Sequence, residues 1–254
     1  MRAILTYHSI DDSGSAISCT RQAFDQHVAW LASGKVQVLS VADLISASSS
    51  DNAIAITFDD AFANFGEYAA PRLIAHGLPV TVFAVTSRVG GTNEWDGNAA
   101  GIPRLPLLGW DGLATLSERG VAIGSHTQTH PDLTTLRPSA IAEEIQGSAD
   151  VIASTIGVRP TLFAYPYGRM NDAVAKVVGR AYQHACTTEF EVIDGGVRAE
   201  WLPRLDAFYF QQPGVLETWG TPTFSRFVAR RHRLRRIRRA AQTTASRLVS
   251  WSHR

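Results

Sequence analysis

The chain has 254 residues, of which 45% are hydrophobic and 19% charged, a composition that suits one globular α/β domain with a substantial core. No apolar stretch approaches the roughly 20 residues of a membrane-spanning helix. The first residues lack the apolar core and cleavage site of a signal peptide, and Cys19 and Cys186 form no CxxC pattern. We therefore expect a cytoplasmic protein.

Short apolar runs alternate with amphipathic segments along the chain. Clusters of β-branched and aromatic residues predict strands at 3–7, 36–39, 53–56, 79–85, 121–124, 161–165, 184–187 and 201–205. Apolar residues at helical spacing predict helices at 18–33, 40–45, 64–76, 110–119, 139–156 and 171–180. This alternation predicts an α/β fold with a parallel sheet, either open or closed into a barrel.

Two adjacent carboxylates, Asp59 and Asp60, follow the predicted strand at 53–56. Their like charges raise each other's pKa, and burial at a strand end disfavours both charges. A divalent cation on one carboxylate would relieve this conflict and leave the other to act as a base. A strand-ending turn with two solvated aspartates is the alternative.

His126 and His130 follow another predicted strand at a spacing of four residues. On a helical turn, both imidazoles would lie on one face, where they could share an ion. Solvated or capping histidines are the commoner origin of such a pair alone. However, the carboxyl ends of parallel strands meet at one edge, so His8, the two aspartates, both histidines and Tyr167 could share a pocket. Two imidazoles and a carboxylate suit Zn²⁺ or a similar ion and leave a position for water.

Three segments together resemble the central motifs of the polysaccharide deacetylases, the carbohydrate esterase family with a NodB-type domain: 57–60, 126–130 and 163–168. The likeness runs from about His8 to about Asp206. It implies a catalytic domain at 1–222, built as a distorted (β/α) barrel of largely parallel strands with an outer layer of helices. It also implies a metal-dependent hydrolase that removes an N-acetyl group from an N-acylated sugar of a polysaccharide or glycan precursor.

The resemblance implies a role for each motif residue. Asp60, His126 and His130 would bind the metal, with zinc expected and cobalt or nickel as alternatives. Asp59 would be the general base that takes a proton from the attacking water. The backbone N–H of Tyr167 would help to bind the oxyanion.

Two features depart from the family pattern. Many members take the general acid from a C-terminal Leu-x-His motif, which we do not find here. Leu5-Thr6-Tyr7-His8 resembles the arrangement in circularly permuted members, so we predict that His8 is the acid; otherwise it caps the first strand. Ala164 stands where many members have an arginine paired with the base. We predict that Arg204 replaces it, the alternative being a surface charge.

The long segment at 87–108 is predicted to be a loop, and its Trp95 could stack on a sugar ring. Trp201 fits equally well in the core or as a sugar platform.

The segment 223–254 is predicted to be a basic amphipathic helix or tail. Residues 225–254 contain ten arginines and no acidic residue, in a chain with 24 basic and 23 acidic residues. Apolar residues recur at helical spacing at Phe227, Leu234, Ile237, Ala241, Leu248 and Trp251. This pattern suits a solvated helix with a docking stripe or an anionic membrane surface, and specific nucleic-acid binding is not expected.

The alternatives for function follow from these patterns. Membrane binding would suit a deacetylase or deformylase of a lipid-linked amino sugar at the cytoplasmic membrane face. A non-catalytic sugar-binding module with the same fold is a second class of function. The residue types at the metal do not separate an acetamide from an O-acetyl ester or a formamide.

Overall fold

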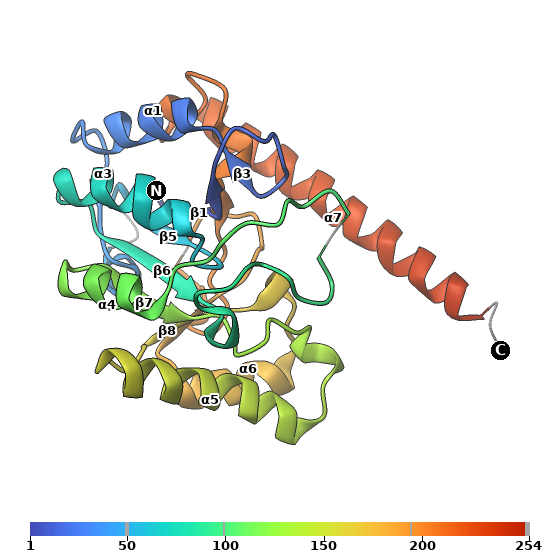
Figure 1. Ribbon diagram of the computed structural model, residues 1–254. Helices are drawn as coiled ribbons and strands as arrows, with labels where there is room; N and C mark the ends of the chain where they lie inside the picture. Colours follow the sequence, from blue (N-terminus) through green and yellow to red (C-terminus); the bar gives the residue numbers. More distant parts are fainter. Residues whose placement is uncertain (49–50, 99, 194, 252–254) are drawn as a thin grey trace.

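The computed structural model describes residues 1–48, 51–98, 100–193 and 195–251, with side chains in the last helix as far as Ile237. Its centre is a sheet of eight parallel strands (Figure 1) in the order β10-β1-β5-β6-β7-β8-β9, with β4 paired to the amino end of β5. These strands are β1 (Arg2–Tyr7), β4 (Gln37–Val38), β5 (Ala53–Phe58), β6 (Val80–Ala84), β7 (Ala122–Ser125), β8 (Leu162–Ala164), β9 (His184–Cys186) and β10 (Leu205–Asp206). Two short strands, β2 (Ser9–Ile10) and β3 (Ser18–Cys19), form a separate pair.

The segment 202–206 joins the two edges of this curled sheet. Leu202 forms a parallel bridge with Cys186 of β9, and Leu205 of β10 pairs with Leu5 of β1. The expected distorted (β/α) barrel is therefore confirmed. The closing segment also carries Arg204 into the interior, where its side chain is 0% exposed.

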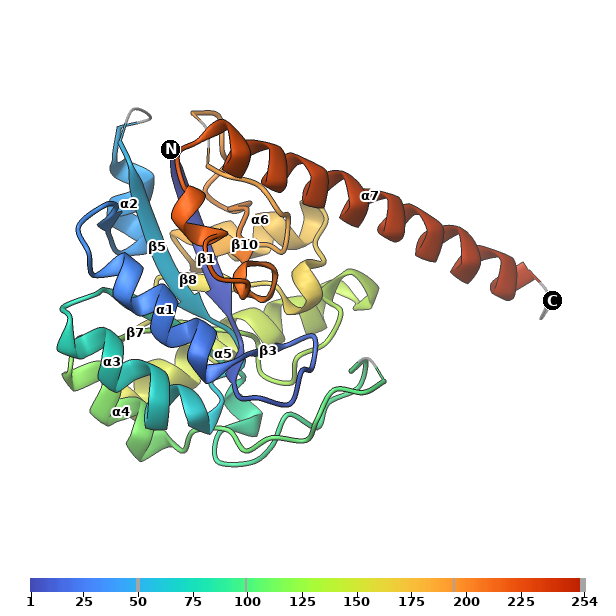
Figure 2. The same ribbon diagram turned by 90° about the horizontal axis from the view of Figure 1, so that it is seen from above.

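Helices cover the outer face of the barrel (Figures 1 and 2). They are α1 (Arg21–Leu31), α2 (Val41–Ser46), α3 (Ala70–Ala75), α4 (Trp110–Glu118), α5 (Pro138–Ile156), α6 (Asp172–Ala181) and α7 (Pro222–Trp251). A π-helical turn, η1 (Phe65–Ala69), precedes α3. Short 3₁₀ turns are η2 (Thr86–Arg88), η3 (Leu133–Thr135), η4 (Pro166–Gly168), η5 (Ala207–Phe210) and η6 (Leu216–Thr218).

Local sequence explains where several helices begin and end. The side chains of Thr20, Ser40 and Asn171 cap α1, α2 and α6 by accepting a hydrogen bond from a backbone N–H of the first turn. Pro138 is the first residue of α5 and has no backbone N–H, which suits a position where that group would have no partner within the helix. Gly157 ends α5 in a left-handed conformation, with φ +81°.

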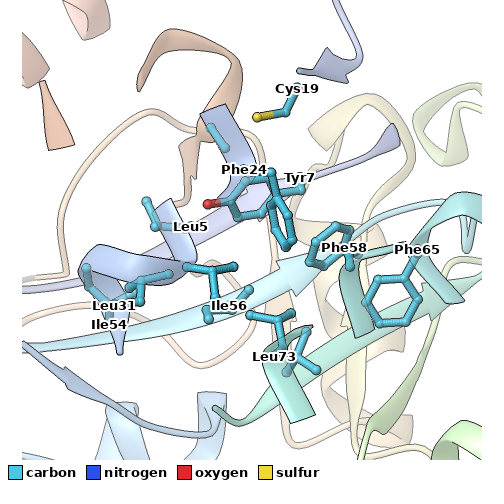
Figure 3. Packing of buried hydrophobic residues seen from close by; sticks show 14 of the residues in the cluster. Leu5, Tyr7, Cys19, Phe24, Leu31, Ile54, Ile56, Phe58, Phe65 and Leu73 are labelled. Carbon is cyan, nitrogen blue, oxygen red and sulfur yellow. The ribbon is translucent and has the colours of Figure 1, made fainter. Parts of the chain in front are cut away.

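The strands alternate between two apolar environments. In β5, Ile54, Ile56 and Phe58 point outward and pack beneath α1 and α3 with Leu5, Phe24 and Leu73 (Figure 3). The intervening Ala53 and Ala55 belong to the interior cluster with Ile4, Phe83 and Leu202. Because β5 presents small residues inward, the barrel can hold the large side chains of Phe83 and Arg204.

Several predicted boundaries were wrong. Ser18 and Cys19 pair with β2 instead of starting α1, and the helix predicted at 64–76 begins as the π-helical turn η1. In the strand predicted at 201–205, only Leu205 belongs to a named strand, because the preceding residues are held by isolated bonds. The segment 126–130 is a loop and not a helical turn.

Helix α7 packs on the barrel through Phe224 and Val228, which are both buried. Its second half projects away from the barrel (Figure 2). The side chains of Ala241, Leu248 and Trp251, part of the predicted apolar stripe, lie outside the described side chains. None of the described helices combines the length and the hydropathy that a membrane crossing requires.

Candidate active site

A pocket of about 300 Å³ lies at the carboxyl ends of the strands. It is lined by His8, Ile17, Asp59, Asp60, Asn93, Trp95, Gly97, Asn98, Ile102, His126, His130, Tyr165, Tyr167, Arg169 and Thr188. Most of the predicted site residues thus meet in one place. Arg204 lies beneath the pocket, where it contacts Asp59.

Asp60, His126 and His130 point potential ligand atoms toward one another. Asp60 Oδ1 lies 3.5 Å from His126 Nε2 and 3.6 Å from His130 Nε2. Tetrahedral coordination with bonds of about 2.0–2.1 Å separates neighbouring ligand atoms by about 3.4 Å. The observed spacing is therefore suited to a shared divalent cation.

An unsatisfied carboxylate oxygen at this cluster supports the same interpretation. Asp60 Oδ1 is buried and has no hydrogen-bond partner among the described residues. Burial raises the pKa of Asp60, although the neighbouring His126 opposes the shift. Burial likewise holds the pKa of His130 well below its usual value. A cation would compensate the buried carboxylate and would accept a lone pair from each imidazole.

The second nitrogen of His126 fixes the orientation of its ring. Its Nδ1–H donates to the carbonyl oxygen of Ala164 at 2.7 Å, so the lone pair of Nε2 faces Asp60. The His130 ring lies between aromatic side chains, with its centre 4.4 Å from that of Trp95 and 4.7 Å from that of Tyr167.

The backbone of the histidine loop is strained. Thr127 and His130 have φ of +69° and +64°, in the left-handed region that disfavours residues with a Cβ atom. Glu144 of α5 secures the loop by accepting hydrogen bonds from the N–H groups of Gln128 and Thr129. His126 and His130 therefore reach the cluster because the loop between them reverses its direction with strained φ angles. The predicted helical turn was wrong for that reason. Asp60 also has a positive φ, +70°. Such strain is common where a site constrains the chain.

Asp59 is paired with Arg204. Two guanidinium nitrogens of Arg204 donate to the two carboxylate oxygens at 2.6 and 2.7 Å, and Nε donates to Thr187 O at 2.9 Å. Burial alone would raise the pKa of Asp59, but the charge and hydrogen bonds of Arg204 hold it well below its usual range. Asp59 is therefore ionised at any ordinary working pH.

His8 lies directly after β1, at the rim of the pocket. Its Nε2 is 3.8 Å from Asp59 Oδ2, and its side chain is 23% exposed. This distance is too long for a hydrogen bond. His8 can therefore reach both the pocket and solvent.

Tyr167 and Gly168 form a tight turn in η4 (Pro166–Gly168), with φ of +59° and +65°. The turn is packed against Thr188, since a Cβ added at Gly168 would lie 2.1 Å from Thr188 Oγ1. The Tyr167 hydroxyl donates to Asp96 O at 2.7 Å, and burial raises its pKa to about 12. The tyrosine is therefore neutral and attached to the long loop.

The tryptophans take different places. Trp95 is 8% exposed, and its ring packs on His130, so only a small part of it remains open to the pocket. Trp201 is 39% exposed and lines a larger groove of about 820 Å³ that shares His8, Tyr167 and Thr188 with the pocket.

The sequence analysis did not identify Thr188 and Glu144. Thr188 follows β9, so its position after a strand was a usable signal. Nothing in the sequence distinguishes Glu144 from the other acidic residues of α5, because its role depends on the loop that folds over it.

Comparison with known sequences identifies a family that matches this chain. A sequence profile of the polysaccharide deacetylases matches residues 46–184, more than half of the chain. The protein YxkH of Bacillus subtilis, whose name assigns it provisionally to the polysaccharide deacetylases, is 28% identical over 192 residues, covering 73% of this chain and 64% of YxkH. Chitin deacetylase 1 of Cryptococcus neoformans is 30% identical over 129 residues, covering 51% of this chain and 24% of that protein. The chain thus spans less than two thirds of these relatives.

Solved protein structures share the fold. Streptococcus pyogenes deacetylase PplD, in complex with acetate, has a TM-score of 0.71 and 22% identity, covering 85% of this chain and 97% of PplD. IcaB from Ammonifex degensii has a TM-score of 0.71 and 19% identity, covering 89% and 96% of the two chains.

Proposed function

This chain belongs to the polysaccharide deacetylase family, and from this premise we propose that it is a metal-dependent hydrolase that removes an N-acetyl group from an N-acylated sugar. The family predicted from three motifs is confirmed. The observation that carries the proposal is the convergence of Asp60, His126 and His130 beside the Asp59–Arg204 pair.

Asp60, His126 and His130 would hold the ion, and their donor set favours zinc, with cobalt or nickel as alternatives. The bound ion would lower the pKa of a water molecule and polarise the acyl carbonyl. Asp59, kept ionised by Arg204, would accept a proton from the attacking water. Arg204 also fixes the orientation of this carboxylate, because it binds both oxygens.

Two further groups would complete the reaction. The backbone N–H of Tyr167 would donate to the oxyanion that forms when the acyl carbon becomes tetrahedral. His8 would protonate the leaving amine, as in circularly permuted members of the family. Its distance of 3.8 Å from Asp59 Oδ2 allows the base and the acid to act on the same substrate.

The groove beside the pocket favours a glycan over a single sugar. Its volume of about 820 Å³ exceeds that of the pocket, and Trp201 offers an exposed aromatic face. Trp95 would contact the sugar only by its pocket edge, since its ring is packed on His130.

Acetate release from a panel of N-acetylated glycans tests the proposal, with removal of the metal by a chelator and its restoration. Asp59→Asn should retain metal but lose roughly 10²–10⁴-fold of the activity, the usual worth of acid–base catalysis. Asp25→Asn is the matched control, because Asp25 is an exposed carboxylate that also pairs with an arginine, Arg72. Unchanged turnover in Asp59→Asn would refute the role of Asp59. Glycan binding without acetate release would favour the non-catalytic alternative.

A second proposal concerns the carrier of the substrate. Leu234 and Ile237 of α7 are 45% and 57% exposed and lie one turn apart. Arg233 and Arg236, also exposed, flank them, and α7 contains no acidic residue. We propose that this face binds an anionic bilayer, which would bring a lipid-linked amino sugar, acetylated or formylated, toward the pocket.

Vesicle flotation tests this binding. The protein should float with anionic vesicles and not with neutral ones, and the double variant Leu234→Ser/Ile237→Ser should lose most of the binding. Val158→Ser is the control, because Val158 is 53% exposed elsewhere on the surface. Equal flotation of the double variant would end the proposal, as would binding to DNA that exceeds binding to the vesicles.

A further inference from the structure

Helix α7 crosses the barrel from one end to the other. Near its start, Val228 lines a groove with Met1, at the amino end of β1. Two turns later, Arg235 lines the larger groove with His8 and Thr188, at the carboxyl ends of the strands. Figure 2 shows the start of the helix beside the N-terminus and its second half beyond the barrel. The helix thereby brings Arg235 to the rim of the proposed active site.

Arg235 is fixed by contacts on several sides. One guanidinium nitrogen donates to the backbone oxygen of Thr188 at 3.1 Å, and another lies 3.6 Å from Asp206 Oδ2. The guanidinium carbon is 5.7 Å from the ring centres of both Phe190 and Tyr209. The side chain is only 23% exposed. An arginine held in this way restrains the backbone that it binds.

The backbone next to Arg235 supports two parts of the proposed catalytic machinery. Thr187 O accepts a hydrogen bond from Arg204, the partner of Asp59. Thr188 Oγ1 donates to Tyr167 O at 3.3 Å and fills the space beside Gly168. A shift of the 187–188 segment would therefore move the Tyr167 turn and loosen the support of Arg204.

We propose that Arg235 is a positioning residue for deacetylation, which holds Thr188 so that the Tyr167 N–H points at the oxyanion. Helix α7 is then a functional part of the catalytic unit, although it lies outside the residues matched by the family profile. This inference rests on the proposed function. It assigns Arg235 no contact with the reacting atoms.

Arg235→Gln removes the charge and shortens the side chain, so that the hydrogen bond to Thr188 O is lost. Because the oxyanion forms only in the transition state, kcat should fall about 10- to 100-fold while KM changes less than about 2-fold. Metal content should stay that of the wild type, since Asp60, His126 and His130 lie on other segments. Arg235→Lys, which keeps the charge, should recover part of kcat. Arg226→Gln is the matched control, because Arg226 is an exposed arginine of the same helix that donates to Pro222 O within α7.

Hydrogen–deuterium exchange tests the same restraint without turnover. Peptides covering 165–169 and 186–190 should exchange faster in Arg235→Gln than in the wild type or in Arg226→Gln. Wild-type kcat in Arg235→Gln, an equal loss in Arg226→Gln, or unchanged exchange in these peptides would overturn the inference. Failure of the wild-type protein itself to release acetate would instead count against the proposed function, and the exchange experiment would still decide the role of Arg235.

Discussion

Replacing Arg204 with methionine tests how the charge of Asp59 is stabilised inside the barrel. The side chains of Arg204 and Asp59 are 0% and 3% exposed, and two hydrogen bonds join them. Methionine would fill much of the space but leave the buried carboxylate without its fixed cation. Breaking a buried pair in this way costs about 3–5 kcal/mol. We expect the free energy of unfolding at pH 7 to fall by about that amount.

The pH dependence of this loss has a definite sign. In the wild type, the folded pKa of Asp59 lies below its unfolded pKa of about 4, so the stabilisation from this carboxylate is present above pH 4. It is lost as the pH falls through the folded pKa. In the variant, burial without Arg204 raises the pKa, so Asp59 becomes protonated in the folded protein. The difference in stability between the two proteins should therefore be largest at pH 7 and smaller at pH 4.

Urea unfolding of the metal-free proteins, followed by circular dichroism at both pH values, measures this difference. Arg159→Met is the control. Arg159 pairs with Asp150 at 2.8 Å, but the two side chains are 56% and 65% exposed, so a loss of about 0–1 kcal/mol is expected. A loss in Arg204→Met no larger than that of the control, or an equal loss at both pH values, would refute the reasoning.

Three shorter predictions concern other residues. His130→Ala should abolish stoichiometric binding of the divalent ion, measured by elemental analysis; full retention would contradict its assignment as a ligand. Gly168→Ala should lower deacetylation and destabilise the fold by about 1–3 kcal/mol, because its φ is +65° and the new Cβ would meet Thr188 Oγ1 at 2.1 Å. Cys19 and Cys186 are buried and have their pKa raised to about 12, so a thiol reagent at pH 8 should modify them only after unfolding.

The sequence was sufficient for features that depend on local pattern. The apolar run of β5 predicted a buried strand, and the carboxylates after it were expected at the strand end where Asp59 and Asp60 lie. The same reasoning predicted His126 and His130 at the same edge, since parallel strands bring their carboxyl ends together.

Contacts across the barrel were decided only by the tertiary structure. Arg204 was a candidate partner for Asp59 with a surface charge as the alternative, and the closing segment 202–206 brings the two together from 145 residues apart. Arg235 and Glu144 had no distinguishing sequence signal. Periodicity reports which face of an element a side chain occupies, but a partner on a distant element depends on strand register and loop path. For that reason, motif residues could be listed from the sequence, while the side chains that hold them in place could not.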